Sequence, residues 1–325
     1  MQIRLTVGGT AFALLILGLF AGPVPLAGPA ALEAQVTGPG PDGRWPLQPS
    51  APGGRVLAPF MEGWYANEDG TFSISFGYRN ANQDTLEIPI GPDNFIEPAQ
   101  FDGMQPTTFL PGHNRGVFTA NLPEAMRDTD VWWTIRKPNG EEAKVPGRIG
   151  AVAYQLDWYP RPHGSVPPRV SFDSDPAEGR GPPGIVAERT LSVAAGSPLT
   201  VSITVREDSE RDRTDFRFDE ALTLRVVWSK HQGPGRVEFT RHESTPVPEQ
   251  AAGGRGGGSG FQGGGPRPNI ISVPDDVESV VRVVATFSEP GEYMLAAQVD
   301  NFRATDSGAG DQCCWTNGYV RVSVR

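Results

Sequence analysis

The chain has 325 residues, a formal net charge of -10 and two cysteines. Such an acidic chain repels nucleic acid and anionic lipid surfaces, and it has neither a basic stripe nor a basic helix to offset the charge, so we expect neither partner. The 40 glycines and 32 prolines, with few apolar residues at helical spacing, indicate an all-β chain rich in turns.

The N-terminus has the pattern of a secretory signal peptide. Arg4 supplies a positive charge, an apolar run extends from Ala11 to Phe20, and small residues continue to Ala34. We expect residues 1–34 to be cleaved off. The apolar run is short for a membrane span, and no second hydrophobic segment of about 20 residues follows. We therefore predict an exported protein, periplasmic or extracellular, with no membrane insertion after signal cleavage.

The next 126 or so residues divide into a leader and a first β-domain. Residues 35–54 are rich in Pro and Gly and lack an apolar period, so we predict a Pro/Gly-rich leader. From 55 to 160 the pattern is β. TFSISFGYRN (71–80) has apolar residues at every second position, which predicts a strand with one buried face. TLEIPIG gives an edge strand because of Pro89, GVFTANL another, and VWWTIRKPNGEEAKV a hairpin. These strands together predict a β-sandwich of the size of an Ig domain.

Trp132 and Trp133 are adjacent in this hairpin, so alternation sends their rings to opposite faces of the sheet. One ring can fill the core and the other must find a partner outside it. The outer ring is either an aromatic platform that stacks on a sugar ring or partner surface, or a ring that packs under a loop or against the second domain.

A Pro-rich linker at residues 161–168 precedes a second β-domain at 169–325. LTVSITV (199–205) and LTLRVVW (222–228) alternate with a period of two residues, and further strands are predicted at RVEFT, VVRVVATF, EYMLAAQV and YVRVSV. Within this domain, residues 251–266 form a Gly-rich loop that cannot pack in a core.

The order LTLRVVWSKHQGPGRVEFT, VVATFSEPGEYMLAAQVDN, GYVRVSV resembles the PKD-type Ig-like domain of extracellular bacterial proteins. The resemblance implies structural roles: a core tryptophan, a turn, and a corner with a tyrosine whose hydroxyl binds nearby backbone. The matching residues are Trp228, Gly233, Pro234, Gly235, Pro290, Gly291 and Tyr293. It also implies a spacer or binding module without a shared catalytic site. The first domain resembles β-domains of exported bacterial proteins that carry no assigned function.

The two cysteines, Cys313 and Cys314, are adjacent and lie in a long connection from Asp300 to Gly318 where the resembled family has a short turn. Two thiols are too few for a structural zinc site, and a Cys-x-x-Cys motif is absent. In an oxidising compartment each cysteine has only its neighbour as intrachain partner. The pair is therefore a structural vicinal disulfide or two buried thiols, a ligand-contacting knuckle beside Trp315, or a redox or copper site.

Two acidic segments offer oxygen ligands. Asp173 and Asp175 have the Asp-x-Asp spacing with which exported Ig-like domains can bind Ca²⁺ at strand ends, and residues 206–220 mix acids with arginines. The alternative is a solvated, internally paired charged surface, because the arginines already neutralise much of the acid.

The sequence motifs favour a non-enzymatic protein without a cofactor. The chain lacks the Gly-x-Ser-x-Gly, His-Glu-x-x-His and phosphate-loop motifs. We predict an all-β protein of two Ig-like β-sandwich domains in tandem. It acts as a binding or spacer module for cell-surface polysaccharide or an envelope protein. The alternative is a hydrolase or metal/redox protein using residues brought together across the domains, such as His231, His242 and the cysteine pair.

Overall fold

The structure is a computed structural model that describes residues 54–157, 164–172, 177–216, 218, 223–245, 267–274, 277–302 and 314–325. Residues Ser50–Arg325 form one compact unit. The predicted signal peptide, the leader up to residue 53, Asp173, Asp175, Cys313 and the Gly-rich loop lie outside the described residues. No helix within the described ranges has the length and apolar character needed to cross a membrane.

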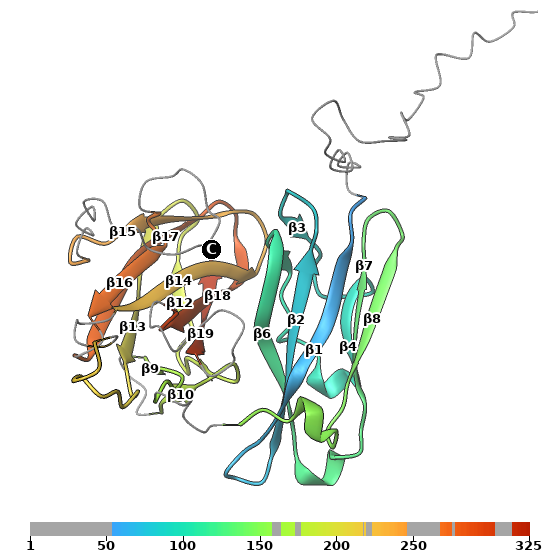
Figure 1. Cartoon of the computed structure of the whole chain (residues 1–325). Coiled ribbons are helices and arrows are strands. Elements are labelled where there is room, and N and C mark those ends of the chain that lie inside the picture. Colours follow the sequence, from blue (N-terminus) through green and yellow to red (C-terminus); the bar gives the residue numbers. More distant parts are fainter. Residues whose placement is uncertain are drawn as a thin grey trace, which may run out of the picture. The chain divides into compact units, whose positions relative to one another are not determined.

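The first β-sandwich packs two sheets, with strand orders β1-β2-β6 and β4-β7-β8, and the short pair β3-β5 completes it in the described residues (Figure 1). Its strands are β1 (Leu57–Ala66), β2 (Phe72–Asn80), β3 (Leu86–Glu87), β4 (Asn94–Glu97), β5 (Thr108–Phe109), β6 (Gly112–Leu122), β7 (Val131–Arg136) and β8 (Glu142–Gly147). Short 3-10 turns lie at η1 (Ala99–Phe101), η2 (Glu124–Met126) and η3 (Val152–Tyr154).

An aromatic cluster fills the space between these two sheets. The rings of Phe76 and Phe118 stack with centroids 5.2 Å apart, and Phe118 meets Trp133 edge-to-face at 5.0 Å. Trp133 is fully buried, as the alternation in the β7-β8 hairpin predicts for one of the two adjacent tryptophans. Truncating an aromatic ring of this kind in a core costs about 3–5 kcal/mol.

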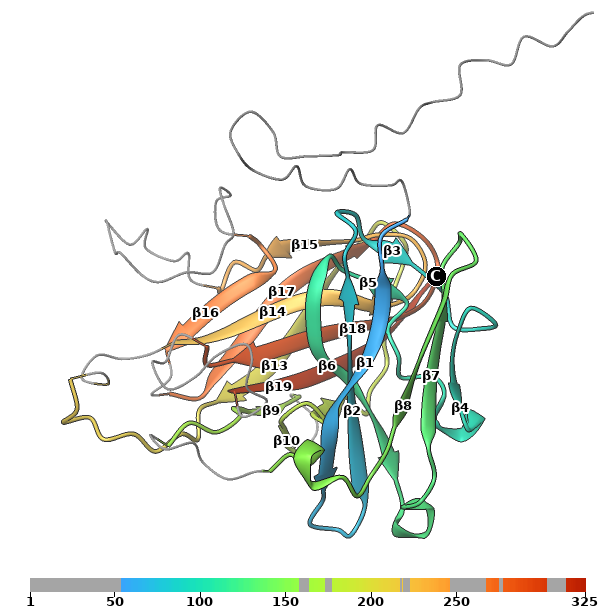
Figure 2. The same cartoon turned by 45° about the vertical axis from the view of Figure 1, so that its right-hand side comes forward.

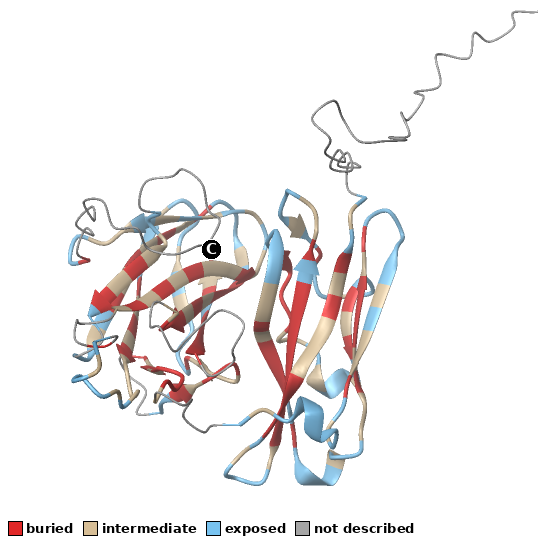
Figure 3. Ribbon diagram, in the orientation of Figure 1, coloured by how far each residue is buried: buried red, intermediate tan, exposed pale blue. Residues whose placement is uncertain are grey.

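Two expectations for the first sandwich need correction. Strand β2 is buried on both faces, because Ser73 and Ser75 are buried as well as their apolar neighbours and the Phe60 ring lies over Gly77 (Figure 3). The small residues Ser73, Ser75 and Gly77 leave room for neighbouring residues to pack over this second face of the strand. The strand predicted in TLEIPIG is reduced to Leu86–Glu87, since its ladder with β5 ends there and Pro89 cannot donate to a longer one.

The second sandwich has the strand arrangement of an Ig-like domain (Figure 2). In the described residues one sheet has the order β10-β9-β13-β17-β15. The other has the order β11-β19-β18-β14-β16, with β12 also pairing in parallel with β19. The strands are β9 (Arg169–Ser171), β10 (Gly179–Arg180), β11 (Ile185–Val186), β12 (Leu191–Val193), β13 (Pro198–Arg206), β14 (Thr223–Gln232), β15 (Val237–Arg241), β16 (Ile270–Pro274), β17 (Ser279–Phe287), β18 (Gly291–Asp300) and β19 (Trp315–Val324).

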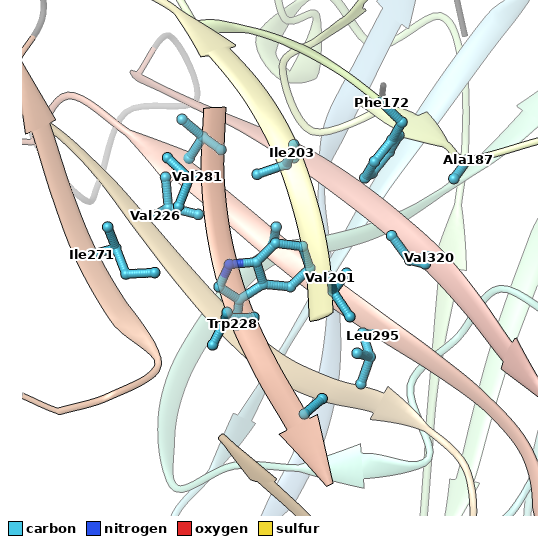
Figure 4. Packing of buried hydrophobic residues seen from close by; sticks show 14 of the residues in the cluster. Phe172, Ala187, Val201, Ile203, Val226, Trp228, Ile271, Val281, Leu295 and Val320 are labelled. Carbon is cyan, nitrogen blue, oxygen red and sulfur yellow. The ribbon is translucent and has the colours of Figure 1, made fainter. Parts of the chain in front are cut away.

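Trp228 on β14 lies at the centre of the second core, where its ring packs among branched aliphatic side chains from both sheets (Figure 4). The end of this sandwich is fixed by Tyr293, whose hydroxyl donates to the carbonyl of Glu289 at 2.8 Å, the arrangement of a tyrosine corner. Gly233 lies beneath this ring, since a Cβ there would be 2.4 Å from Tyr293 Cδ1. The Gly-Pro-Gly turn and the corner therefore pack against each other.

Strand β19 begins at Trp315, four residues before the predicted start at Tyr319. Trp315 to Gly318 pair with Asp300 to Ala297 of β18, so the connection ends at Cys314 and not at Gly318. Gly318 belongs to the strand because its missing side chain admits Ile203 and Phe172 of the core: a Cβ there would be 2.7 Å from Ile203 Cδ1. The Asn-Gly dipeptide serves packing here and forms no turn.

Candidate functional site

The two sandwiches meet through a set of polar contacts, which we call the junction. On one side are the backbone of residues 103–107 and a segment of β6, and on the other are the ends of β14 and β19. Both sides belong to the same compact unit. The contacts are mainly side-chain donors of the second sandwich that bind backbone carbonyls of the first.

A bulge in β14 directs the first group of donors. Lys230 pairs with Leu295 and Gln232 with Met294, so His231 is an extra residue in the ladder. A bulge of this kind re-aims a side chain. His231 Nε2 lies 2.7 Å from the carbonyl oxygen of Met104 and must donate, because a carbonyl only accepts.

Backbone and amide contacts surround this histidine. The amide N–H of Thr107 donates to the carbonyl of His231 at 2.9 Å. Gln232 Nε2 donates to the carbonyls of Gly103 and Gln105, both at 2.8 Å. The 103–107 segment is thus bound through its main chain, which makes this half of the junction depend on backbone conformation more than on side-chain identity.

His231 is held in its neutral form. Burial lowers its pKa to about 4, and the bond to the Met104 carbonyl opposes the shift only in part. The ring meets Tyr319 of β19 edge-to-face with centroids 5.2 Å apart. Burial also raises the pKa of Tyr319. Both groups are therefore uncharged hydrogen-bond donors at neutral pH, and neither brings a charge into the junction.

A second bulge lies on the opposite side of the junction. One residue of β2, Gly77, lies opposite three of β6, from Arg115 to Val117, because Phe76 pairs with Phe118 and Tyr78 with Asn114. The carbonyls that this bulge exposes are bound by β19: Asn317 Nδ2 donates to Gly116 at 2.6 Å and the hydroxyl of Tyr319 to Val117 at 2.7 Å. Within the described sheet β6 is an edge strand, so these contacts cover an otherwise open edge.

Gly116 is required where β19 approaches β6. Its φ is +50°, and a Cβ there would lie 2.7 Å from Trp315 Cζ2 and 3.2 Å from Pro182 Cβ. Trp315 is 1% exposed, and its ring also meets Phe302 at 5.9 Å. Trp315, the predicted neighbour of a ligand-contacting knuckle, thus has its ring packed inside the molecule against the first sandwich.

Cys314 lies just before this strand, beside the segment that connects the sandwiches. Its sulfur is 4.0 Å from Ser165 Oγ, and its carbonyl accepts from the amide of Asn301 at 3.1 Å. Cys314 is buried and disulfide-bonded, so it is not a free thiol. The sequence offers one other cysteine, Cys313, which lies outside the described residues. A vicinal pairing remains our prediction for this bond.

Buried polar side chains extend the contacts around Cys314. Arg211 and Glu207 face each other with their nearest atoms 3.8 Å apart, and their side chains are 1% and 4% exposed. Asn301 Nδ2 donates to Glu207 at 3.1 Å and to the carbonyl of Val166 at 3.0 Å. A buried ion pair with these additional hydrogen bonds fixes geometry more than it adds stability. The cluster joins the connecting segment, the 207–211 loop and the end of β18.

The charged stretch 206–220 is paired partly within itself and partly with Arg169 of β9 where the structure describes it. Asp208 binds Arg169 at 2.9 Å and Arg206 at 3.0 Å. Burial raises the pKa of Asp208, but the hydrogen bonds from the two arginines outweigh that effect and hold the pKa below its usual range. Among the described residues, no group of three or more His, Cys, Asp or Glu side chains is placed to hold a metal ion. Asp173 and Asp175 lie outside those residues.

The histidines that the alternative hypothesis invoked make separate contacts. His231 binds Met104 in the junction, whereas His242 Nδ1 contacts Ser244 Oγ at 2.8 Å in a local turn. In the part of the chain that the structure describes, the two histidines therefore have different hydrogen-bond partners.

Trp132, the neighbour of the buried Trp133, lies half-buried on the outer face of the β4-β7-β8 sheet. Lys144 Nζ is 5.0 Å and Arg148 Cζ 5.8 Å from the centre of its ring. The Trp132 ring therefore packs against two cationic side chains of the first sandwich and not against the second sandwich. We call the outer side of these three strands the Trp132 face.

The sequence pattern did not predict the junction, although it contained partial signals. The break in alternation at His231 and Gln232 marks the bulge, and the polar Asn317 beside Tyr319 precedes an otherwise apolar strand. Assigning these residues to an interface needs the partner carbonyls, which depend on backbone conformation in a distant segment. No residue-type pattern encodes such acceptors.

A scan against protein-family models finds no match for this chain, and a search among curated proteins finds none either. Solved structures give distant similarities. The D00-D0 domain of Intimin has a TM-score of 0.23 and 12% identity, over 82% of this chain and 99% of that chain. The D0-D1 domain of Intimin has a TM-score of 0.22 and 12% identity, over 82% and 100%. The Yersinia pseudotuberculosis adhesin InvE has a TM-score of 0.20 and 11% identity, over 82% and 58%. Similarity at these TM-scores supports no inference about function, so the proposals below depend on the residues of this chain.

Proposed function

We propose that this protein is an exported, non-enzymatic module whose two β-sandwiches form one rigid body and act as a spacer or binding module, toward cell-surface polysaccharide or another envelope protein. The observation that carries the proposal is the junction. Most of its donors come from two strands of one sandwich and bind main-chain carbonyls at a bulge and a loop of the other. The amide of Thr107 donates in the opposite direction, and Lys230 forms an ion pair with Glu87 at 3.0 Å.

Rigidity follows from the direction of these bonds. Interfaces between domains of one chain commonly allow motion, unless they are large or well specified. Here most donors face a fixed backbone acceptor, and breaking one such bond while it stays buried costs about 1–3 kcal/mol. Several of them must break together for the sandwiches to rotate. The Cys314 cluster lies three residues before Asn317 along the chain and ties Ser165 and Val166 of the connecting segment to the second sandwich.

Further parts of the proposal come from the sequence. The signal-peptide pattern supports export to the periplasm or beyond. The resemblance of residues 169–325 to a PKD-type Ig-like domain supports a spacer or binding role, and residues 161–168 are the proposed boundary between the domains. The burial of Trp228 in the core and the hydrogen bond from the Tyr293 hydroxyl to the carbonyl of Glu289 support this resemblance.

Scanning calorimetry of the mature chain tests the rigid-body proposal. A single transition, with equal calorimetric and van 't Hoff enthalpies, is expected if the sandwiches unfold together. The double variant N317A/Y319F removes two junction donors and should separate the transition into two. Two independent transitions in the unmodified protein would show that the junction does not couple the sandwiches and would overturn the proposal.

A further inference from the structure

The Trp132 face combines aromatic rings and charged side chains in a regular pattern. By register, Phe95 of β4 lies opposite Thr134 of β7, and Glu97 lies opposite Trp132. Phe95 and Trp132 are therefore diagonal neighbours on one side of the sheet, about 7–8 Å apart at their backbones. Both rings are half-buried, so each presents part of its surface to solvent.

Every cation on this face that contacts a ring also has an acidic partner. Arg136 binds Glu142 at 2.7 Å and lies over the Phe95 ring at 5.5 Å. Lys144, next to Trp132, binds Glu97 at 2.9 Å.

The third cation beside Trp132 is paired in the same way. Arg148 binds both oxygens of Asp130, at 2.9 and 2.8 Å. These three pairs contribute no net charge, and they offer alternating hydrogen-bond donors and acceptors beside the rings.

This chemistry selects among classes of ligand. Tryptophan, phenylalanine and arginine suit a protein interface, but this face also carries Lys144, Glu97, Glu142 and Asp130, which are of types depleted in the centre of such interfaces. These charged residues disfavour a protein partner. An anionic polymer is disfavoured because the cations are already neutralised. Small ligands are usually bound in concave pockets, whereas these residues lie on the outer face of a three-stranded sheet in the described structure.

We propose that the Trp132 face binds a neutral glycan. The apolar C–H faces of the sugar rings stack on Trp132 and Phe95, and the hydroxyl groups bond to the alternating carboxylates and cations. Lys144 and Arg148 have side chains 37% and 57% exposed, so both can move aside for a sugar while keeping their carboxylate partners. The inference rests on the proposed non-enzymatic binding role and adds the surface and the ligand class to it.

Affinity electrophoresis of the mature protein tests this inference. Native gels contain a neutral soluble polysaccharide, either galactomannan or mixed-linkage β-glucan, and parallel gels contain the anionic polysaccharide alginate. We expect retardation by at least one neutral polymer and none by alginate. The Trp132→Ala variant should weaken the binding by about tenfold, the effect of losing one stacked aromatic ring.

The matched control is Phe216→Ala, which removes an aromatic ring that is 82% exposed on the second sandwich. Its binding should equal that of the unmodified protein. Phe95→Ala provides a second variant on the face, and the thermal midpoint of each variant shows whether it is folded.

Three results would overturn the glycan site: no retardation by either neutral polymer, retardation by alginate alone, or equal binding of the Trp132→Ala and unmodified proteins. None of them bears on the rigidity of the junction, which calorimetry tests separately. Failure of this inference and failure of the proposed rigid module are thus distinguishable.

Discussion

Replacing Gly116 by alanine probes the contact between the two sandwiches at a single atom. Gly116 has a φ of +50°, a conformation that costs a residue with a side chain about 1–2 kcal/mol. The added Cβ would also lie 2.7 Å from Trp315 Cζ2 and 3.2 Å from Pro182 Cβ. Because Trp315 is buried and cannot swing aside, overpacking adds about 1–3 kcal/mol. The expected loss is about 2–5 kcal/mol of unfolding free energy.

Gly140→Ala is the matched control for this change. Gly140 lies in the β7-β8 turn with a φ of +84°, and a Cβ added there would have no other atom within 4 Å. It should lose only the backbone cost of about 1–2 kcal/mol. Equilibrium unfolding in urea gives the loss of unfolding free energy for each variant. The difference between the two losses is the contribution of the contact at the junction. Equal losses would mean that β19 does not pack against residue 116, and would refute the description of the junction.

Three further changes test other parts of the structure. The His231→Gln variant should lose less stability on acidification than the unmodified protein. Below pH 6.5 the histidine of the unfolded chain binds a proton, whereas the folded His231, with its pKa of about 4, stays neutral. This difference destabilises the folded state of the unmodified protein by up to about 3 kcal/mol at pH 4. Urea midpoints at pH 7 and pH 4 measure this, with His242→Gln as control, and a stability difference that is the same at both pH values would contradict it. Tyr293→Phe should cost about 1 kcal/mol by removing the corner hydrogen bond, and an unchanged urea midpoint would show that the bond does not contribute. Arg225→Ala should cost about 2–4 kcal/mol because it removes two bonds, at 3.0 and 2.8 Å, to the buried carboxylate of Asp300. This is somewhat less than the loss for a fully buried pair, since Arg225 is partly exposed, and a loss near zero in the same assay would contradict that expectation.

The sequence predicts the strands well where the alternation is strong and local. LTVSITV and TFSISFGYRN are strands β13 and β2, and the Pro-Asn-Gly turn joins β7 to β8. The pair Trp132 and Trp133 divides between the two faces of its sheet, as its adjacency requires. In each of these cases the pattern depends on burial of one strand face, which residue types record directly.

Residues whose roles depend on distant backbone were harder to predict. Asn317 and Gly318 have the composition of a turn but belong to β19, because the core requires a side chain of minimal size at Gly318. The donors at the junction bind carbonyls, and a carbonyl is present at every residue. Sequence cannot indicate which of them a bulge exposes, so the bulges at His231 and Gly116 required the structure.

The fixed arrangement of the two sandwiches is most directly tested by a distance measurement between spin labels. Asp128→Cys places a label on an exposed turn of the first sandwich, and Glu238→Cys places one on β15 of the second. Double electron–electron resonance of the labelled mature chain should give one narrow distance distribution, which broadens when Asn317 and Tyr319 are replaced by alanine and phenylalanine. A broad or multimodal distribution in the chain with an intact junction would contradict the account.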